Sequence, residues 1–151
     1  MVIAITLHLL AAVIWVGGMF FAYMALRPVA ASLLEPAQRL PLWSQTFARF
    51  FPWVWVSVIL LLVTGLWMVK SVFGGFGQAG LYIHLMAGLG ILMMLLFMHV
   101  FFAPYRRMKQ ALAGNDMPEA ARRLAQIRII IAINLTLGLI VTVVGVAGRY
   151  M

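Results

Sequence analysis

Long runs of apolar residues dominate this chain, and they occur four times. Residues 2–26, 51–69, 81–103 and 129–148 contain no Asp, Glu, Lys or Arg. At about 1.5 Å per residue, a helix of about 20 residues crosses the roughly 30 Å hydrocarbon core of a bilayer. The pattern therefore predicts an all-α fold, an integral membrane four-helix bundle, in which residues 1–151 form a single transmembrane domain within the lipid bilayer.

Composition and charge add an orientation to this bundle. The chain is 66% hydrophobic and 9% charged, with a net charge of +8. Residues 27–49 carry three Lys or Arg and residues 106–128 carry six, whereas the opposite side has only Lys70 and Arg149. The positive-inside rule then predicts cytoplasmic basic loops and both termini outside, N-out/C-out. This asymmetry accounts for the charge without a nucleic-acid partner.

Proline, glycine and tryptophan mark the predicted boundaries. The first span is expected to end at Arg27-Pro28, since proline disfavours helix at the preceding residue. Residues 75–80 match the dinucleotide-binding fingerprint, but that motif needs a preceding strand, so we interpret them as a turn. Asp116 or Asn115 is expected to cap the last helix. An interfacial aromatic belt is expected at Trp43, Trp53 and Trp55.

Two of the three histidines occupy similar depths near the predicted outer side. His8 lies in the first span and His84 in the third, and two imidazoles from facing helices can hold a haem b. Lys70 and Arg149 are the outer cations that could pair with its propionates, and Trp15 lies on nearly the same face as His8. Interhelical hydrogen bonding to Ser, Thr or a backbone carbonyl is the alternative role for both histidines.

Copper is the alternative metal. Imidazole and thioether ligands together favour Cu(I), which makes His8, His84, His99 and Met86 the candidate metal ligands, with Met68 a further sulfur near the outer face. His99 follows His84 by 15 residues, roughly 22 Å along a helix, so one ion cannot use both. Methionines are also ordinary filling of apolar cores.

The remaining polar and small residues limit the possible chemistry. The three acids, Glu35, Asp116 and Glu119, all lie in predicted cytoplasmic loops, which argues against hydrolysis or transport by a buried acid. No catalytic residue can be assigned. On the last span we expect Asn134, Thr136 and Thr142 to point inward. The pairs Gly18/Ala22 and Gly138/Gly145 allow close helix approach within the bundle or in a homodimer.

The order of motifs resembles CopD-type membrane proteins, the copper-resistance D domain, along nearly the whole chain. The matching residues are Leu7-His8, Ile14-Trp15-Val16-Gly17-Gly18, Leu26-Arg27-Pro28, Arg49-Phe50-Phe51-Pro52, Val63-Thr64-Gly65-Leu66 and Ile133-Asn134-Leu135 with Gly138. The resemblance implies copper handling in the bacterial inner membrane.

A more distant similarity is to HemJ-type protoporphyrinogen oxidases, which are associated with haem b. It rests on His8, the following Trp-x-Gly and His84. HemJ-like proteins carry a lysine where this chain has Met86, so the similarity implies haem binding rather than oxidase activity.

Three hypotheses follow from the sequence. The first is a CopD-like protein that binds haem b through His8 and His84, a membrane oxidoreductase or electron-transfer protein with a quinone or periplasmic redox partner. The second is a copper-binding or copper-transport protein with His and Met ligands and a periplasmic copper partner. The third is a structural subunit without a cofactor.

Overall fold

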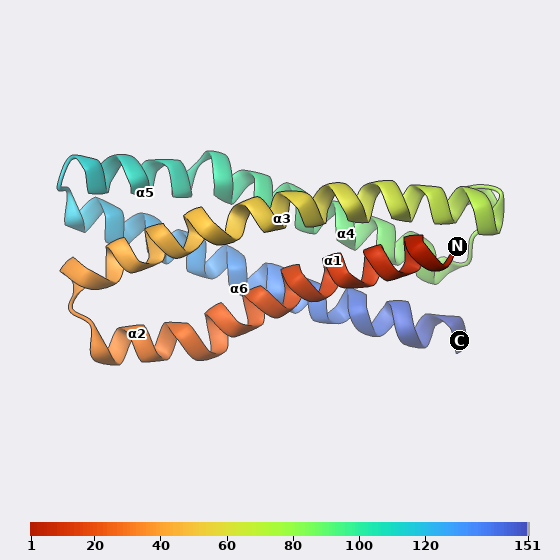
Figure 1. Cartoon of the computed structure of the whole chain (residues 1–151), viewed down its shortest axis with the longest axis horizontal. Coiled ribbons are helices and arrows are strands. Elements are labelled where there is room, and N and C mark those ends of the chain that lie inside the picture. The colour runs from red at the N-terminus through yellow and green to blue at the C-terminus, as the bar shows by residue number, and fades with distance from the viewer. Residues whose placement is uncertain (151) are drawn as a thin grey trace.

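The computed structural model describes residues 1–150, apart from the side chain of Arg149. It consists of four long rods of helix (Figure 1). The first rod comprises α1 (Val2–Phe20), the π-helical stretch η1 (Phe21–Leu26) and α2 (Arg27–Leu33), and the second is α3 (Pro36–Phe73). The third joins α4 (Leu81–Phe102) to α5 (Pro104–Ala113), and the fourth is α6 (Met117–Ala147), followed by the 3-10 turn η3 (Gly148–Tyr150). A short 3-10 turn, η2 (Phe76–Gln78), lies between α3 and α4.

The expected all-α membrane bundle is confirmed. Each rod contains a segment long and apolar enough to cross a membrane, and residues 1–150 contain no strand. Large apolar side chains remain exposed along the outer faces of the rods, for example Val13, Ile59, Leu95 and Val143. A surface of this kind is stable against lipid rather than water, so the chain is a multi-pass membrane protein.

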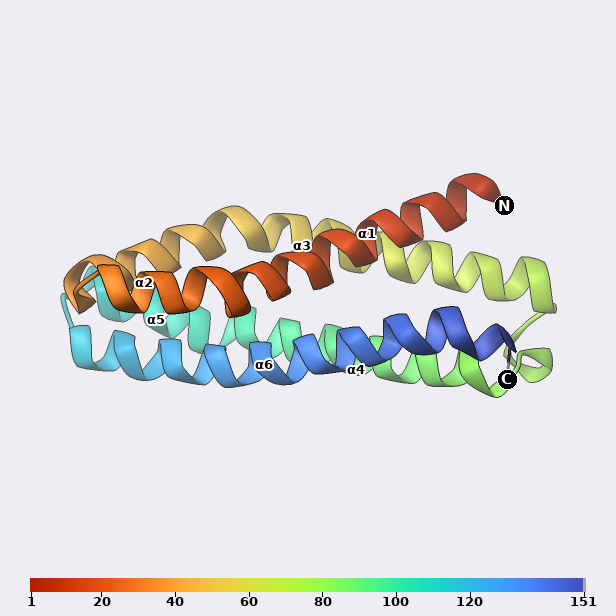
Figure 2. The same cartoon turned by 90° about the horizontal axis from the view of Figure 1, so that it is seen from below.

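The rods pack as two helical hairpins, the first and second rods forming one and the third and fourth the other, and the two hairpins contact each other. α1 packs along α3, and α4 and α5 both pack along α6, while α3 and α1 also contact α6. Both termini lie at one end of the bundle (Figure 1). We call this the terminal end; it includes Lys70 and His84. The opposite end, where residues 27–49 and 106–128 lie, is the basic end. Figure 2 shows the rods spreading apart toward the terminal end.

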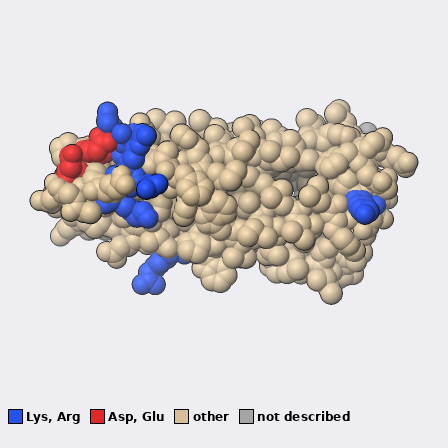
Figure 3. Space-filling model, turned by 90° about the horizontal axis from the view of Figure 1, so that it is seen from above, with Lys and Arg blue, Asp and Glu red and all other residues tan. Residues whose placement is uncertain are grey.

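Charge is distributed unevenly between the two ends. Figure 3 shows Lys and Arg gathered at the basic end together with Asp and Glu, and a wide uncharged band along the middle of the molecule. This band corresponds to the apolar spans, whose side chains can contact lipid tails. The molecule therefore has the charge pattern from which its orientation was predicted.

The core lies in the basic half and contains a cluster of aromatic rings. Phe51 packs edge-to-face on Phe97 with ring centroids 5.4 Å apart, and Trp55 packs on the same Phe97 at 5.1 Å. The expected aromatic belt is wrong for Trp43, which is only 6% exposed, whereas Trp53 faces outward at 60% exposure. Helix pairing hides Trp43, because the first turns of α3 are covered by α6 and are not free at an interface.

Two helix boundaries differ from the expectation. The first rod continues through Pro28 to Leu33, because the preceding turn is already π-helical: the Arg27 N–H bonds the Ala22 carbonyl five residues earlier. The widened turn accommodates a proline that lacks an N–H. α3 begins at Pro36 and therefore contains Pro41 and Pro52 in its interior. Only Leu34 and Glu35 separate the first two rods.

The predicted turns and cap are present. Gly74 and Gly75 have φ of 74° and 137°, which glycine adopts without strain, and no strand precedes them in the described chain. The fingerprint-like residues therefore form a turn, as expected. At the start of α6, the Asp116 carboxylate accepts a hydrogen bond from the Glu119 N–H, the expected N-cap.

Candidate functional site

His8 lies between α1 and α3 at the terminal end. Its Nδ1 is 2.8 Å from Oγ1 of Thr64, a residue 56 positions later that is only 6% exposed. The imidazole also lies against Gly65, where an added Cβ would be 3.3 Å from the His8 Cε1 atom. Glycine at position 65 thus lets the ring approach the backbone of α3. The result is a half-buried histidine held by the neighbouring helix.

The hydrogen bonds around Thr64 determine the tautomer of the neutral His8 ring. The Thr64 hydroxyl donates its single proton to the Leu60 carbonyl. It can therefore only accept from His8, which requires the proton of the neutral imidazole to be on Nδ1. Nε2 then carries the free lone pair. A histidine whose other nitrogen is fixed by such a partner is arranged as metal-ligating histidines are.

In His84, as in His8, Nδ1 faces a hydrogen-bond acceptor, but here the acceptor belongs to the same helix. His84 lies exposed in the first turn of α4, and its Nδ1 is 3.1 Å from the carbonyl oxygen of Gly80, the N-cap residue. A carbonyl can only accept, so the neutral form of the ring has its proton on Nδ1 and its free lone pair on Nε2. The ring also faces Phe76 with centroids 5.8 Å apart.

The structure does not join His8 to His84. Each ring makes its hydrogen bond elsewhere, His8 to α3 and His84 to its own helix cap. α1 packs on α3, and Figure 2 shows the first turns of α1 and α4 on opposite sides of the bundle. Among the described residues, no group of three or more His, Cys, Asp and Glu could hold a metal ion.

Of the other predicted metal ligands, His99 and Met86 lie apart from His8, whereas Met68 lies on the neighbouring face of α3. His99 is exposed in the last turn of α4, toward the basic end. Met86 is half-buried between α4 and α6, where a Cβ on Gly145 would be 3.4 Å from its sulfur. Met68 is half-buried one turn after Thr64, on the face of α3 that receives His8.

The residues predicted to surround a haem are dispersed. Trp15 is 2% exposed in the core and packs edge-to-face on Phe97, so it is interior as expected. Lys70 is exposed in the last turn of α3. The side chain of Arg149 lies outside the described residues. The structure therefore gives Trp15 a packing role and leaves the cations as predictions.

Of the three α6 residues expected to point inward, one side chain is buried and two face outward. Asn134 is buried and its Nδ2 donates to the Met93 carbonyl at 3.3 Å, while its Oδ1 has no partner. The expectation that Thr136 and Thr142 point inward is wrong: both are exposed and donate to carbonyls of their own helix. Such back-bonding satisfies a hydroxyl without an interior partner.

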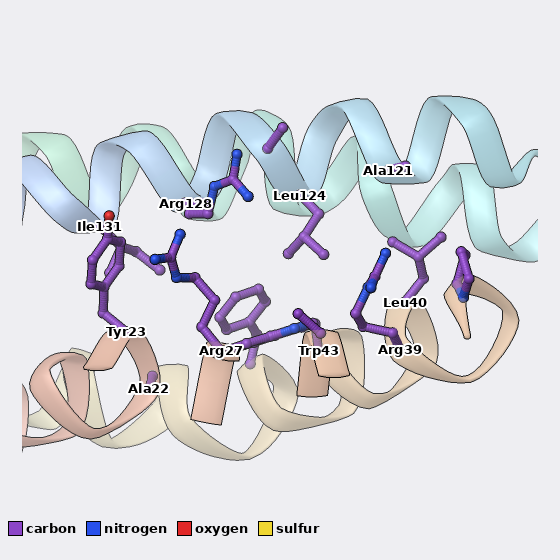
Figure 4. A pocket seen from close by; sticks show the side chains of 14 residues that line it. Ala22, Tyr23, Arg27, Arg39, Leu40, Trp43, Ala121, Leu124, Arg128 and Ile131 are labelled. Atoms are coloured by element: carbon purple, nitrogen blue, oxygen red, sulfur yellow. The ribbon is translucent and has the colours of Figure 1, made fainter. Parts of the chain in front are cut away.

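Sequence reasoning missed two features. It did not identify Thr64 as the partner of His8, although a threonine at the same depth of the next antiparallel span is a usable signal. It also missed a cavity of about 290 Å³ at the basic end, lined by Arg27, Arg39 and Arg128 (Figure 4). Those arginines had been considered only as indicators of orientation.

A comparison with protein-family models gives one relationship. The model described as "Copper resistance protein D", CopD, matches residues 44–148. No curated protein and no solved structure matches the chain. The match supports the resemblance to CopD-type proteins. It gives no support to the HemJ-type similarity. The description of the family associates it with copper.

Proposed function

Because the chain belongs to the copper resistance protein D family, we propose that it binds copper ions at the terminal end of its membrane bundle, with Nε2 of His8 as a ligand. The observation that carries this proposal is the hydrogen bond from His8 to Thr64, whose hydroxyl is committed to the Leu60 carbonyl. It leaves Nε2 unprotonated and holds the ring in one orientation. Both are requirements for a metal-ligating imidazole.

Cu(I) is the ion that these surroundings suit. The nearby membrane helices supply imidazole and thioether but no thiolate or carboxylate, and soft ligands of this kind select Cu(I). Met68 is the thioether that we assign to the same site, since it follows Thr64 by one turn of α3 and is half-buried. The predicted orientation places this end outside, where a bacterial inner-membrane protein meets periplasmic copper.

The packing favours copper over haem b. A haem with two histidine ligands would need His8 and His84 to converge, whereas they are held by different elements. Cu(I) accepts two or three ligands within one pair of helices and needs no such convergence. His84 remains a separate, exposed imidazole at the same end.

A Cu(I) competition titration in detergent micelles tests the proposal. The purified protein would be titrated against a chromophoric Cu(I) chelator, together with His8→Ala, Thr64→Val and the matched control His99→Ala. We expect stoichiometric binding that weakens about 100-fold in His8→Ala, and by about 10- to 100-fold in Thr64→Val, because valine cannot accept the Nδ1 proton. His99→Ala should bind as the wild type does.

Two results would contradict the proposal. One is a wild-type protein that takes up no Cu(I); the other is a His8→Ala variant with unchanged affinity. An absorption spectrum of the same preparation tests haem, since a Soret band that disappears in both His8→Ala and His84→Ala would restore the haem hypothesis.

A further inference from the structure

The basic end contains a cavity that the copper site does not use. It has a volume of about 290 Å³ and lies between the first rod, the start of α3 and the first half of α6. Four alanines line it, from both the first rod and α6: Ala22, Ala31, Ala121 and Ala125. Because their side chains are short, the two rods leave space between them instead of closing the gap.

Three arginines from three different elements face this cavity. Arg27 comes from α2, Arg39 from the first turn of α3 and Arg128 from α6. Figure 4 shows Arg27 and Arg39 rising from one wall of the cavity, while Arg128 lies along α6 on the opposite wall. Positive charges that line one cavity repel one another, and an anion bound among them would offset that repulsion.

The chain itself supplies no such anion in the part that the structure describes. Its two ion pairs both use Glu119, with Arg122 and Arg123 as partners. The Arg27 guanidinium lies over the Tyr23 ring at 4.3 Å, and its Nε is buried without a hydrogen-bond partner. Arg27, Arg39 and Arg128 thus have no carboxylate partner among the described residues, and their terminal N–H groups can donate to an anion bound in the cavity.

The remaining wall of the cavity is apolar. Leu40, Trp43, Phe47, Leu124 and Ile131 provide aliphatic and aromatic surface beside the three guanidinium groups. A ligand that matches both parts has a compact anionic group joined to a hydrocarbon. The fork of an arginine matches phosphate oxygens, and basic pockets between membrane helices on the cytoplasmic side bind anionic lipid headgroups.

We propose that this cavity binds one anionic phospholipid, whose headgroup phosphate is held by Arg27, Arg39 and Arg128 while its glycerol and first methylenes lie against the apolar wall. The site is independent of the copper proposal, because it lies at the opposite end of the bundle. It also gives the three arginines a role besides setting orientation.

Native mass spectrometry of the full chain with phosphatidylglycerol and phosphatidylcholine tests this proposal. We expect the wild type to retain one phosphatidylglycerol, with an apparent affinity at least about tenfold above that for phosphatidylcholine. The double variant Arg27→Gln/Arg128→Gln should lose that preference. Arg106→Gln/Arg107→Gln is the matched control, because both residues are exposed on α5 and do not line the cavity, and it should keep the preference.

A second variant tests the cavity without changing charge. Ala125→Phe fills the space and should reduce phosphatidylglycerol binding about tenfold, while the protein remains monodisperse on size exclusion and binds Cu(I) as the wild type does. Unchanged lipid binding in Ala125→Phe, or equal binding of the two lipids by the wild type, would overturn the proposal. If inorganic phosphate at millimolar concentration displaces phosphatidylglycerol completely, the site serves a soluble anion and the lipid assignment is wrong.

Discussion

Single contacts between helices decide what the candidate residues can do. His8 was identifiable from the sequence because a histidine within an apolar span needs a partner. The partner was not identifiable, since Thr64 lies 56 residues away and meets His8 only when α1 packs against α3. His8 makes the interhelical hydrogen bond that is the alternative to metal binding, whereas His84 bonds only the N-cap carbonyl of its own helix. The His8 bond also prepares Nε2 for a metal, so the two roles are compatible.

Gly138 illustrates the same dependence on packing. It is buried where α6 meets both α1 and α4, and an added Cβ would lie 2.9 Å from Val16 Cγ2 and 3.1 Å from Met93 Cε. The small residues of α6 thus serve close packing within the bundle, one of the two roles expected from the sequence. Val16 is β-branched and cannot easily turn away.

We therefore expect Gly138→Ala to lower the free energy of unfolding by about 1–3 kcal/mol, the usual range for overpacking. Gly90→Ala is the control, because nothing lies within 4 Å of a Cβ at that position. It should leave stability unchanged or raise it by up to about 1 kcal/mol, since alanine is the better helix former. Thermal unfolding in detergent micelles measures both; equal stability losses would refute the packing argument.

At the level of elements, the apolar pattern predicted the helices but not their ends. The first rod passes Pro28 because its preceding turn is π-helical, and a π-turn leaves no mark in hydrophobic periodicity. Capping was more predictable, because an N-cap depends on residues close in sequence. Asp116 and Glu119 formed the expected cap at the start of α6.

The cap can be tested with a matched pair of variants. Asp116→Ala removes the acceptor for the Glu119 N–H, and we expect it to lower stability by about 0.5–2 kcal/mol. Asp116→Asn keeps an acceptor oxygen and should retain most of that stability. The comparison is again thermal unfolding, and an asparagine variant as unstable as the alanine variant would exclude the hydrogen bond as the cause.

For the whole molecule, the distribution of charge predicts the orientation in the membrane, which packing alone does not. Nine of the eleven Lys and Arg lie in the two basic segments, 27–49 and 106–128, so we expect that end to face the cytoplasm. The structure adds that three of these arginines enclose a cavity, which counting charges along the chain could not reveal. The fold was therefore readable from the sequence, whereas contacts between rods required coordinates.

The chain contains no cysteine, which allows a direct test of orientation. Gln78→Cys and Ala113→Cys place single thiols at exposed positions of opposite ends. The test uses cells whose outer envelope has been removed and whose inner membrane is intact. A membrane-impermeant maleimide should label Gln78→Cys in these cells. It should label Ala113→Cys only after the inner membrane is permeabilised. The reverse pattern would invert the orientation and place the His8 site on the cytoplasmic side.

X-ray absorption spectroscopy at the copper edge tests the central claim most directly. The Cu(I)-loaded wild-type protein should show imidazole scattering from a coordinated nitrogen together with a sulfur scatterer. The imidazole contribution should disappear in His8→Ala and persist in His99→Ala. A spectrum that is identical in wild type and His8→Ala would show that copper is held elsewhere and would contradict the account.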